Sequence, residues 1–313
     1  MPKERVLIAD LFRVIAIFLV ILSHILITIG SPQSKAGQAS FGVFPFYWNT
    51  WGEVGITLFL IVSGFGLGYK YRGGEIKFTP FFINRIVRIY PVYYFSLLFA
   101  LIIQIAFAIR GSLVRDQAFV LLPGFSCFDF ILALTGMNAF FGKWGGDLVG
   151  ASWFVGLIMS MYLLFPLISD GLRRSPWLCM IFLFVISSAS RLLIADSRVF
   201  TGNPMLWFPL NRVFEFSTGV ALGQLIRPDL LTRLNTGLRK IPFLFFLSEL
   251  SFPLFLIHDP LRRFITWEPQ PILPLVSGIL VFLVLSIVVS IMALESNKRI
   301  KSIIPDKYLP QFG

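Results

Sequence analysis

The feature that most constrains this chain is a long apolar segment near its N-terminus that carries two ionisable side chains. Residues 5–30 read RVLIADLFRVIAIFLVILSHILITIG, with Arg13 and His24 inside the apolar run. About 20 apolar residues span the hydrocarbon core of a bilayer, and ionisable residues within such a span are costly and therefore indicate function. The two positions return to nearly the same helix face, about 16 Å apart along the axis. We predict a membrane helix that presents a cation and an imidazole on one face.

The rest of the chain predicts an all-α, polytopic transmembrane helical bundle with about 8 to 10 spans. Of its 313 residues, 56% are hydrophobic and 14% are charged, whereas soluble domains average about 25% charged residues. Apolar runs of spanning length cover residues 7–29, 51–69, 89–109, 151–169, 176–195, 207–226, 241–260 and 271–294. A further apolar segment, 118–136, is interrupted by Pro123, Gly124, Asp129 and Gly136, which favours a broken, re-entrant or interfacial element.

The basic residues predict the orientation of these spans. If 118–136 does not cross the membrane, most Lys and Arg residues fall in loops on one side, and that side is the cytoplasm by the positive-inside rule. We therefore expect eight spans with both termini cytoplasmic, although one extra pair of spans would preserve the parity. The Lys and Arg residues that give the net charge of +11 lie mostly in loops on one side, where they set the topology. We therefore expect no nucleic-acid partner.

His24 is the predicted catalytic base, because imidazole is the side chain best suited to accept a proton near neutral pH. The only other histidine, His258, also falls near the outer end of its span. Asp259 and Pro260 follow it, so the simpler interpretation is a histidine that ends a helix and is satisfied by a neighbouring carbonyl. Glu53 begins the second span on the outer side and is a candidate to orient His24.

Three arginines are candidates to bind a phosphorylated ligand from the cytoplasmic side. Arg85 and Arg88 follow Thr79 and Pro80, which predict an N-cap and a first helical residue, and they share one helix face. Two guanidiniums at a membrane boundary suit phosphates, although ordinary topology-setting charge explains them equally well. Arg13 has a local alternative too, because Asp10 lies three residues earlier on the same face.

Other polar and small residues have structural interpretations. Arg212 and Glu215 fall within one span and suggest a buried ion pair, and the GFGLG segment at 64–68 suggests close helix packing rather than a nucleotide loop. Trp153, Tyr162 and Pro166 suggest packing and interface anchors. The two cysteines, Cys127 and Cys179, predict neither a disulfide framework nor a metal site.

Several segments, in order along the chain, resemble the acyltransferase 3 family of integral-membrane carbohydrate O-acyltransferases. ADLFRVIAIFLVILSH is similar to the family's opening motif, in which Arg or Lys is followed by ten residues and then His, here Arg13 and His24. NRIVRIYP is similar to its Arg-x-x-Arg motif, here Arg85 and Arg88. Further matches are TLFLIVSGF, SWFVGLIMSMYLLFP, RVFEFSTG and LSELSFPLFLIHDP, the last of which contains His258.

The resemblance implies that residues 1–313 form a single integral-membrane acyltransferase domain. It implies transfer of an acyl group, most often acetyl, from cytoplasmic acyl-CoA to a hydroxyl of a cell-surface or lipid-linked glycan, in the inner membrane of a bacterium. Arg85 and Arg88 would hold the CoA phosphates, Arg13 would position the thioester, and His24 would act as base or nucleophile, with acyl-CoA as donor and no metal. The oligomeric state stays open.

The chain departs from the family pattern in two places, which keep alternatives open. Many members carry a glutamate five residues after the tryptophan of the fourth span, where this chain has Ile158. The family is commonly described with ten spans, whereas we expect eight here. A regulatory membrane protein that has lost catalysis is one alternative, and a multi-pass transporter or flippase for a glycan or lipid is the other.

Overall fold

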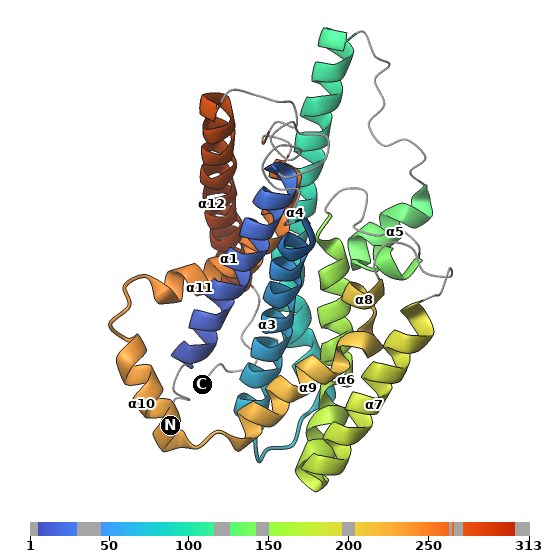
Figure 1. The fold of residues 1–313 in the computed structure, drawn as a ribbon, viewed down its shortest axis with the longest axis vertical. Coiled ribbons are helices and arrows are strands. Elements are labelled where there is room, and N and C mark those ends of the chain that lie inside the picture. The colour runs from blue at the N-terminus through green and yellow to red at the C-terminus, as the bar shows by residue number, and fades with distance from the viewer. Residues whose placement is uncertain are drawn as a thin grey trace.

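The computed structural model describes residues 6–29, 45–115, 126–141, 150–195, 204–262, 265 and 272–303. In these residues the chain forms helices and no strand, which confirms the all-α prediction (Figure 1). The helices are α1 (Leu7–Ile29), α3 (Pro45–Tyr71), α4 (Phe78–Arg115), α5 (Cys127–Thr135), α6 (Ser152–Arg174), α7 (Pro176–Ala195), α8 (Pro204–Trp207), α9 (Pro209–Leu225), α10 (Pro228–Leu238), α11 (Leu244–Leu261) and α12 (Ile272–Ile303), with a 3₁₀ turn over Asn138–Phe141.

Within the described ranges, seven helices are long and apolar enough to cross a membrane, and the protein is therefore an integral membrane protein. They are α1, α3, α4, α6, α7, α11 and α12. The remaining predicted span, 207–226, corresponds to α9, whose 17 residues extend over about 26 Å at 1.5 Å per residue. That length is slightly below the roughly 30 Å of a hydrocarbon core. Among the described helices, α3 and α9 form the most extensive contact, so α9 belongs to the bundle although it is shorter than a full span.

The interrupted segment at 118–136 contains only a short helix in its described part. α5 has nine residues, about 14 Å, so it cannot cross a bilayer. Asp129 closes a capping box with Ser126 at its start, and Gly136 ends it in the left-handed conformation. The Tyr90 hydroxyl donates to the Thr135 carbonyl at 3.0 Å, which ties α5 to α4. Pro123 and Gly124 lie outside the described residues.

The start of α4 differs from the prediction. Phe78 is already helical, so Thr79 is not the N-cap, and Pro80 lies in the first turn, where its missing N–H leaves no helical bond unmade. The helix continues through Pro91 without a break. The basic segment before the third span is therefore part of one 38-residue helix rather than a separate loop and helix.

Glycines set the contact between α3 and α9, which confirms the packing role predicted for the GFGLG segment. A Cβ on Gly64 or Gly68 would collide with the backbone carbonyl of Phe216 or Val220, and the α9 glycines at 219 and 223 face α3 carbonyls in the same way. Each helix thus contributes two glycines four residues apart. Small residues at this spacing let two helix backbones approach closely in a membrane.

The bundle has two ends that matter for function. At one end, which we call the basic end, the end of α3, the start of α4 and the end of α12 meet, with Arg85, Arg88 and Lys301 near one another. At the other, which we call the histidine end, α1 and α11 bring His24 to His258. In Figure 1 the far ends of α4 and α12 rise above the other helices on the histidine side.

Candidate active site

The two histidines of the chain are bonded to each other. His24 Nδ1 lies 2.6 Å from His258 Nε2, and the rings are stacked with centroids 4.9 Å apart. His258 is fully buried, and its Nδ1 lies 2.9 Å from the carbonyl oxygen of Leu254, one helical turn earlier. The expectation that His258 is satisfied by a helix carbonyl is confirmed, but the structure adds a second partner that sequence reasoning missed.

These two bonds determine where the protons lie on the neutral pair. A carbonyl oxygen only accepts, so His258 Nδ1 donates to Leu254 and its Nε2 carries a lone pair. That lone pair accepts the proton of His24 Nδ1, and in neutral His24 the remaining nitrogen, Nε2, then carries no proton. An imidazole held in this tautomer presents Nε2 as a base. The bond to His258 fixes the orientation of the His24 ring.

An ion pair and a close backbone contact lie beside the histidines. Arg262 Nη1 donates to Asp259 Oδ1 at 3.0 Å, and both side chains act electrostatically on His24. A Cβ at Gly150 would collide with the Asp259 carboxylate, so only glycine lets the chain before α6 approach this group so closely. The charges of Asp259 and Arg262 next to His24 therefore compensate each other. The Asp259 carboxylate also lies against the backbone of Gly150.

Arg13 is paired, as its spacing from Asp10 predicted. Arg13 Nη1 donates to Asp10 Oδ1 at 2.9 Å, and the Ser248 hydroxyl on α11 donates to the same oxygen at 2.7 Å. The aspartate is buried, whereas 24% of the arginine side chain is exposed. The pairing thus fixes the Arg13 guanidinium beside α11, and its role toward the donor stays a prediction.

Arg85 is a buried cation surrounded by aromatic rings. Only 4% of its surface is exposed, and its guanidinium carbon lies 5.6 Å from the ring centroids of both Phe81 and Tyr162. Tyr71 at the end of α3 packs edge-on against Phe81. The Arg85 Nε has no hydrogen-bond partner. Within the described part of the chain, the Arg85 side chain is therefore held by ring faces rather than by a carboxylate.

Two further cations lie near Arg85 at the basic end. Arg88 is exposed one helical turn later, and Lys301 on α12 interacts electrostatically with both arginines and with Glu249. Sequence reasoning found the two arginines by their spacing but missed Lys301, because more than 200 residues separate it from them. The single available signal was the basic run at the end of the last span.

Glu53, the residue predicted to orient His24, interacts electrostatically with α9. Its electrostatic partner is Arg212 on α9, whose Nη2 also donates to Thr57, one turn after Glu53, at 2.8 Å. Arg212 pairs with Glu215 at 3.2 Å, which confirms the predicted buried pair. The face of α3 that packs on α1 is formed by neighbouring positions such as Gly55. The structure thus brings Glu53 toward α9, and its role in orienting His24 stays a prediction.

Ile158 lies inside the bundle, with 2% of its surface exposed. It belongs to the same buried stretch of α6 as Trp153 and Tyr162, both of which pack against aromatic neighbours as predicted. At this position the chain therefore offers an apolar contact and no carboxylate. Among the described residues, no cluster of three or more His, Cys, Asp or Glu side chains has the arrangement of a metal site.

The fold and this arrangement define a class of protein: a polytopic membrane protein with a bonded histidine pair near one end and a cationic cluster at the other. The chain matches the model of the acyltransferase 3 family, described as an acyltransferase domain, over residues 7–288. It belongs to that family and is a membrane acyltransferase. No curated protein and no solved structure matches it significantly.

Proposed function

We propose that the protein transfers an acyl group, with acetyl as the first candidate, from acyl-CoA to a hydroxyl of a cell-surface or lipid-linked glycan. The whole chain would act as one membrane domain in a bacterial inner membrane, with the basic end and both termini in the cytoplasm. The observation that carries the proposal is the His24–His258 bond, because it presents one imidazole nitrogen of a membrane helix as a base.

The donor would enter at the basic end. Arg85, Arg88 and Lys301 supply positive charge for the CoA phosphates. Arg13 and His24 lie on one continuous helix, about 16 Å apart along its axis, a separation comparable to the length of a pantetheine arm. A thioester extended along α1 would therefore pass Arg13 and reach His24.

In the transfer step His24 Nε2 would accept the proton of the acceptor hydroxyl while its oxygen attacks the thioester carbonyl. The tetrahedral intermediate then collapses, the C–S bond breaks, and the CoA thiolate takes the proton from His24. The bond from His24 Nδ1 to His258 would orient the ring and stabilise the imidazolium. If His24 instead carries the acyl group, pre-steady-state kinetics show a burst of CoA release before product forms.

The catalytic assignment is tested with purified protein, labelled acetyl-CoA and a glycan acceptor. We expect His24→Ala to lose transfer by at least about 10²-fold while unfolding at a temperature close to wild type. The matched control is Phe18→Ala on the same helix, since 61% of Phe18 is exposed on the surface of the bundle. Full transfer by His24→Ala would contradict the assignment.

The donor assignment is tested by equilibrium binding of CoA. Arg88→Ala should weaken binding by about tenfold, the effect of losing one charge-assisted hydrogen bond, whereas Arg174→Ala, which removes an exposed arginine, should not. Unchanged CoA affinity in Arg88→Ala would remove its role. Glycan movement across vesicles without acyl-CoA consumption would instead indicate a transporter, and CoA binding without turnover a regulatory protein.

A further inference from the structure

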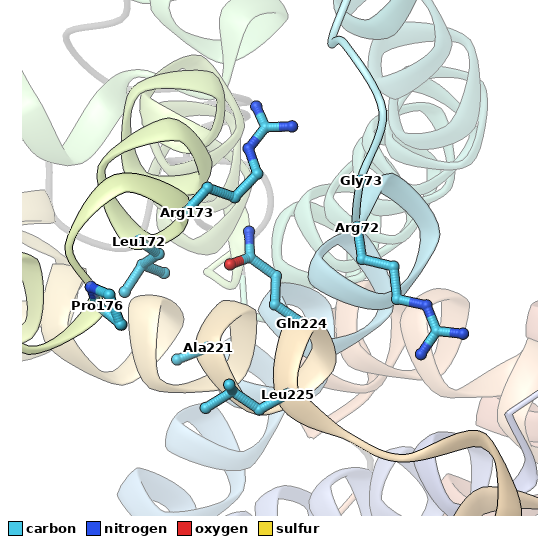
Figure 2. A pocket seen from close by; sticks show the side chains of 8 residues that line it. All are labelled: Arg72, Gly73, Leu172, Arg173, Pro176, Ala221, Gln224 and Leu225. Carbon is cyan, nitrogen blue, oxygen red and sulfur yellow. The ribbon is translucent and has the colours of Figure 1, made fainter.

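The basic end has a pocket beside the last turn of α9 that does not form a shared anion site. Leu225, the last residue of α9, lines this pocket of about 280 Å³ together with Arg72 and Arg173 (Figure 2). The two guanidiniums point in different directions in Figure 2, and that of Arg72 lies over the Tyr69 ring, 4.7 Å from its centroid. We therefore assign no ligand to this pocket.

The short helix that follows α9, α10, also lies at the basic end. Its 11 residues extend over about 17 Å at 1.5 Å per residue, so it cannot cross a bilayer. α11 begins shortly after it, and the start of α1 packs against it (Figure 1). Since α1 and α11 are long and apolar enough to span the membrane, α10 lies at the boundary between membrane and water.

One side of α10 is bound to the start of α1. Leu231 and Asn235 lie one turn apart on this side, and each has 1% of its surface exposed. Asn235 Oδ1 accepts a hydrogen bond from the Leu7 backbone N–H at 2.9 Å. Leu7 is the first residue of α1, so its N–H has no partner within that helix. The bond caps α1, and together with the buried Leu231 it fixes which side of α10 faces outward.

The neighbouring side of α10 is apolar and exposed. Leu230 and Leu234 lie one turn apart, and 46% and 38% of their surfaces are exposed. The exposed apolar surface continues after the helix at Phe243, which is 76% exposed. Phe243 has a φ of 61°, a left-handed conformation that is unfavourable for a residue with a Cβ. Two leucines and an aromatic ring are thus presented outward, which is favourable where this surface meets hydrocarbon rather than water.

Basic residues flank this apolar surface. Arg227, Arg233 and Lys240 are exposed, and among the residues that the structure describes no carboxylate forms an ion pair with any of them. Asp229 is the single acidic residue in the sequence from 226 to 243, and it lies on the opposite side of the helix from Leu231. Exposed apolar side chains beside uncompensated cations are typical of helices that lie in the plane of an anionic membrane surface.

We propose that α10 and the residues up to Phe243 bind the anionic lipid surface of the membrane. Leu230, Leu234 and Phe243 enter the boundary between headgroups and acyl chains, and the three exposed cations pair with lipid phosphates. A soluble acidic protein would pair with the cations but leave the apolar side chains against water. Through its bond to the start of α1, the bound helix also holds the span that carries the proposed base. This membrane contact does not depend on acyl transfer.

The contact is tested with an environment-sensitive fluorophore on single cysteines in nanodiscs, with Cys127 and Cys179 replaced by serine. The reporter is Leu234→Cys, and the matched control is Thr236→Cys, an exposed position on the other side of the same helix. We expect spin-labelled phosphatidylcholine to quench the fluorophore at 234 and to leave that at 236 bright. Added phosphatidylglycerol should shift the emission at 234 to shorter wavelength. Equal quenching at the two positions would overturn the proposal.

A charge variant separates binding to an anionic surface from any other apolar contact. With the fluorophore at 234, Arg233→Gln should weaken the response to phosphatidylglycerol about fivefold, the effect of one basic residue near an anionic membrane. Arg174→Gln, which removes an exposed arginine of α6, should leave the response unchanged. An emission shift that ignores phosphatidylglycerol but grows with protein concentration would overturn the proposal, because a second copy of the chain would then cover this surface. Nanodiscs present both membrane surfaces, so the result holds for either orientation of the protein.

Discussion

At the scale of single residues, the reactivity proposed for His24 depends on what His258 can accept. His258 Nδ1 is committed to the Leu254 carbonyl, so its Nε2 is the acceptor for His24. A partner that cannot accept would leave the His24 ring without this bond and free to adopt the other tautomer. The distinction between accepting and merely filling space can be tested by substitution.

We predict that His258→Leu lowers the transfer rate by about 10²-fold or more, the usual contribution of a well-oriented general base. His258→Gln should lose less, because its side-chain oxygen can accept the His24 proton while its amide can donate elsewhere. The measurement is kcat for acetyl transfer at saturating acetyl-CoA, with thermal unfolding as the check on folding. Equal losses in both variants would show that His258 only fills space.

Arg85 is a second residue whose chemistry can be separated from its charge. Lysine keeps the charge but lacks the planar fork that binds phosphate oxygens in pairs and stacks on aromatic rings. We predict that Arg85→Lys weakens CoA binding by about tenfold, measured by equilibrium binding in detergent. Arg174→Lys is the control at an exposed position of the same end. An unchanged dissociation constant in Arg85→Lys would mean that Arg85 supports packing and not the donor.

At the scale of helices, the α3–α9 contact depends on which glycine of the GFGLG segment faces the partner. A Cβ at Gly64 would collide with the Phe216 carbonyl, whereas a Cβ at Gly66 would lie 3.8 Å from Arg13 Nη2, an ordinary contact. The two glycines are two residues apart on one helix, so alanine at either position changes helix propensity equally. Packing is therefore the difference between them.

We predict that Gly64→Ala destabilises the protein by about 1–3 kcal/mol, the usual cost of overpacking, because neither backbone can yield without moving a helix. Gly66→Ala should be neutral or slightly stabilising, since alanine favours a helix over glycine by up to about 1 kcal/mol. Thermal unfolding of both variants in the same detergent checks the prediction. A destabilisation as large in Gly66→Ala as in Gly64→Ala would show that packing is not the cause.

The helices themselves were predictable, and most of their partners were not. Hydropathy located the spans because each is a local property of about 20 residues, and the Asp10–Arg13 bond followed from a spacing within one turn. His24 and His258 are 234 residues apart, so no local pattern joins them. The predicted start of α4 was wrong because the Thr79-Pro80 pair favours a helix that begins at Pro80, whereas Phe78, whose ring stacks on Phe82, is already helical.

At the scale of the whole molecule, the proposed reaction requires the basic end to face the compartment that supplies acyl-CoA. The order of the helices places the turn between α3 and α4 at this end, and α10, which begins after α9, belongs to it too. Glu75 in that turn and Asp229 at the start of α10 are both exposed. A reporter at either position therefore tests the same orientation from two separate segments.

We predict that cysteine at position 75 or 229, introduced with Cys127 and Cys179 replaced by serine, reacts with a membrane-impermeant maleimide in inside-out vesicles but not in right-side-out vesicles. The physical reason is the excess of Lys and Arg at this end, which resists translocation. Full labelling of both positions after detergent is the control for reactivity. Labelling in right-side-out vesicles would place the basic end outside, and Arg85, Arg88 and Lys301 would then be unable to meet cytoplasmic CoA. The His24–His258 geometry would survive such a result, but the proposed donor path along α1 would not.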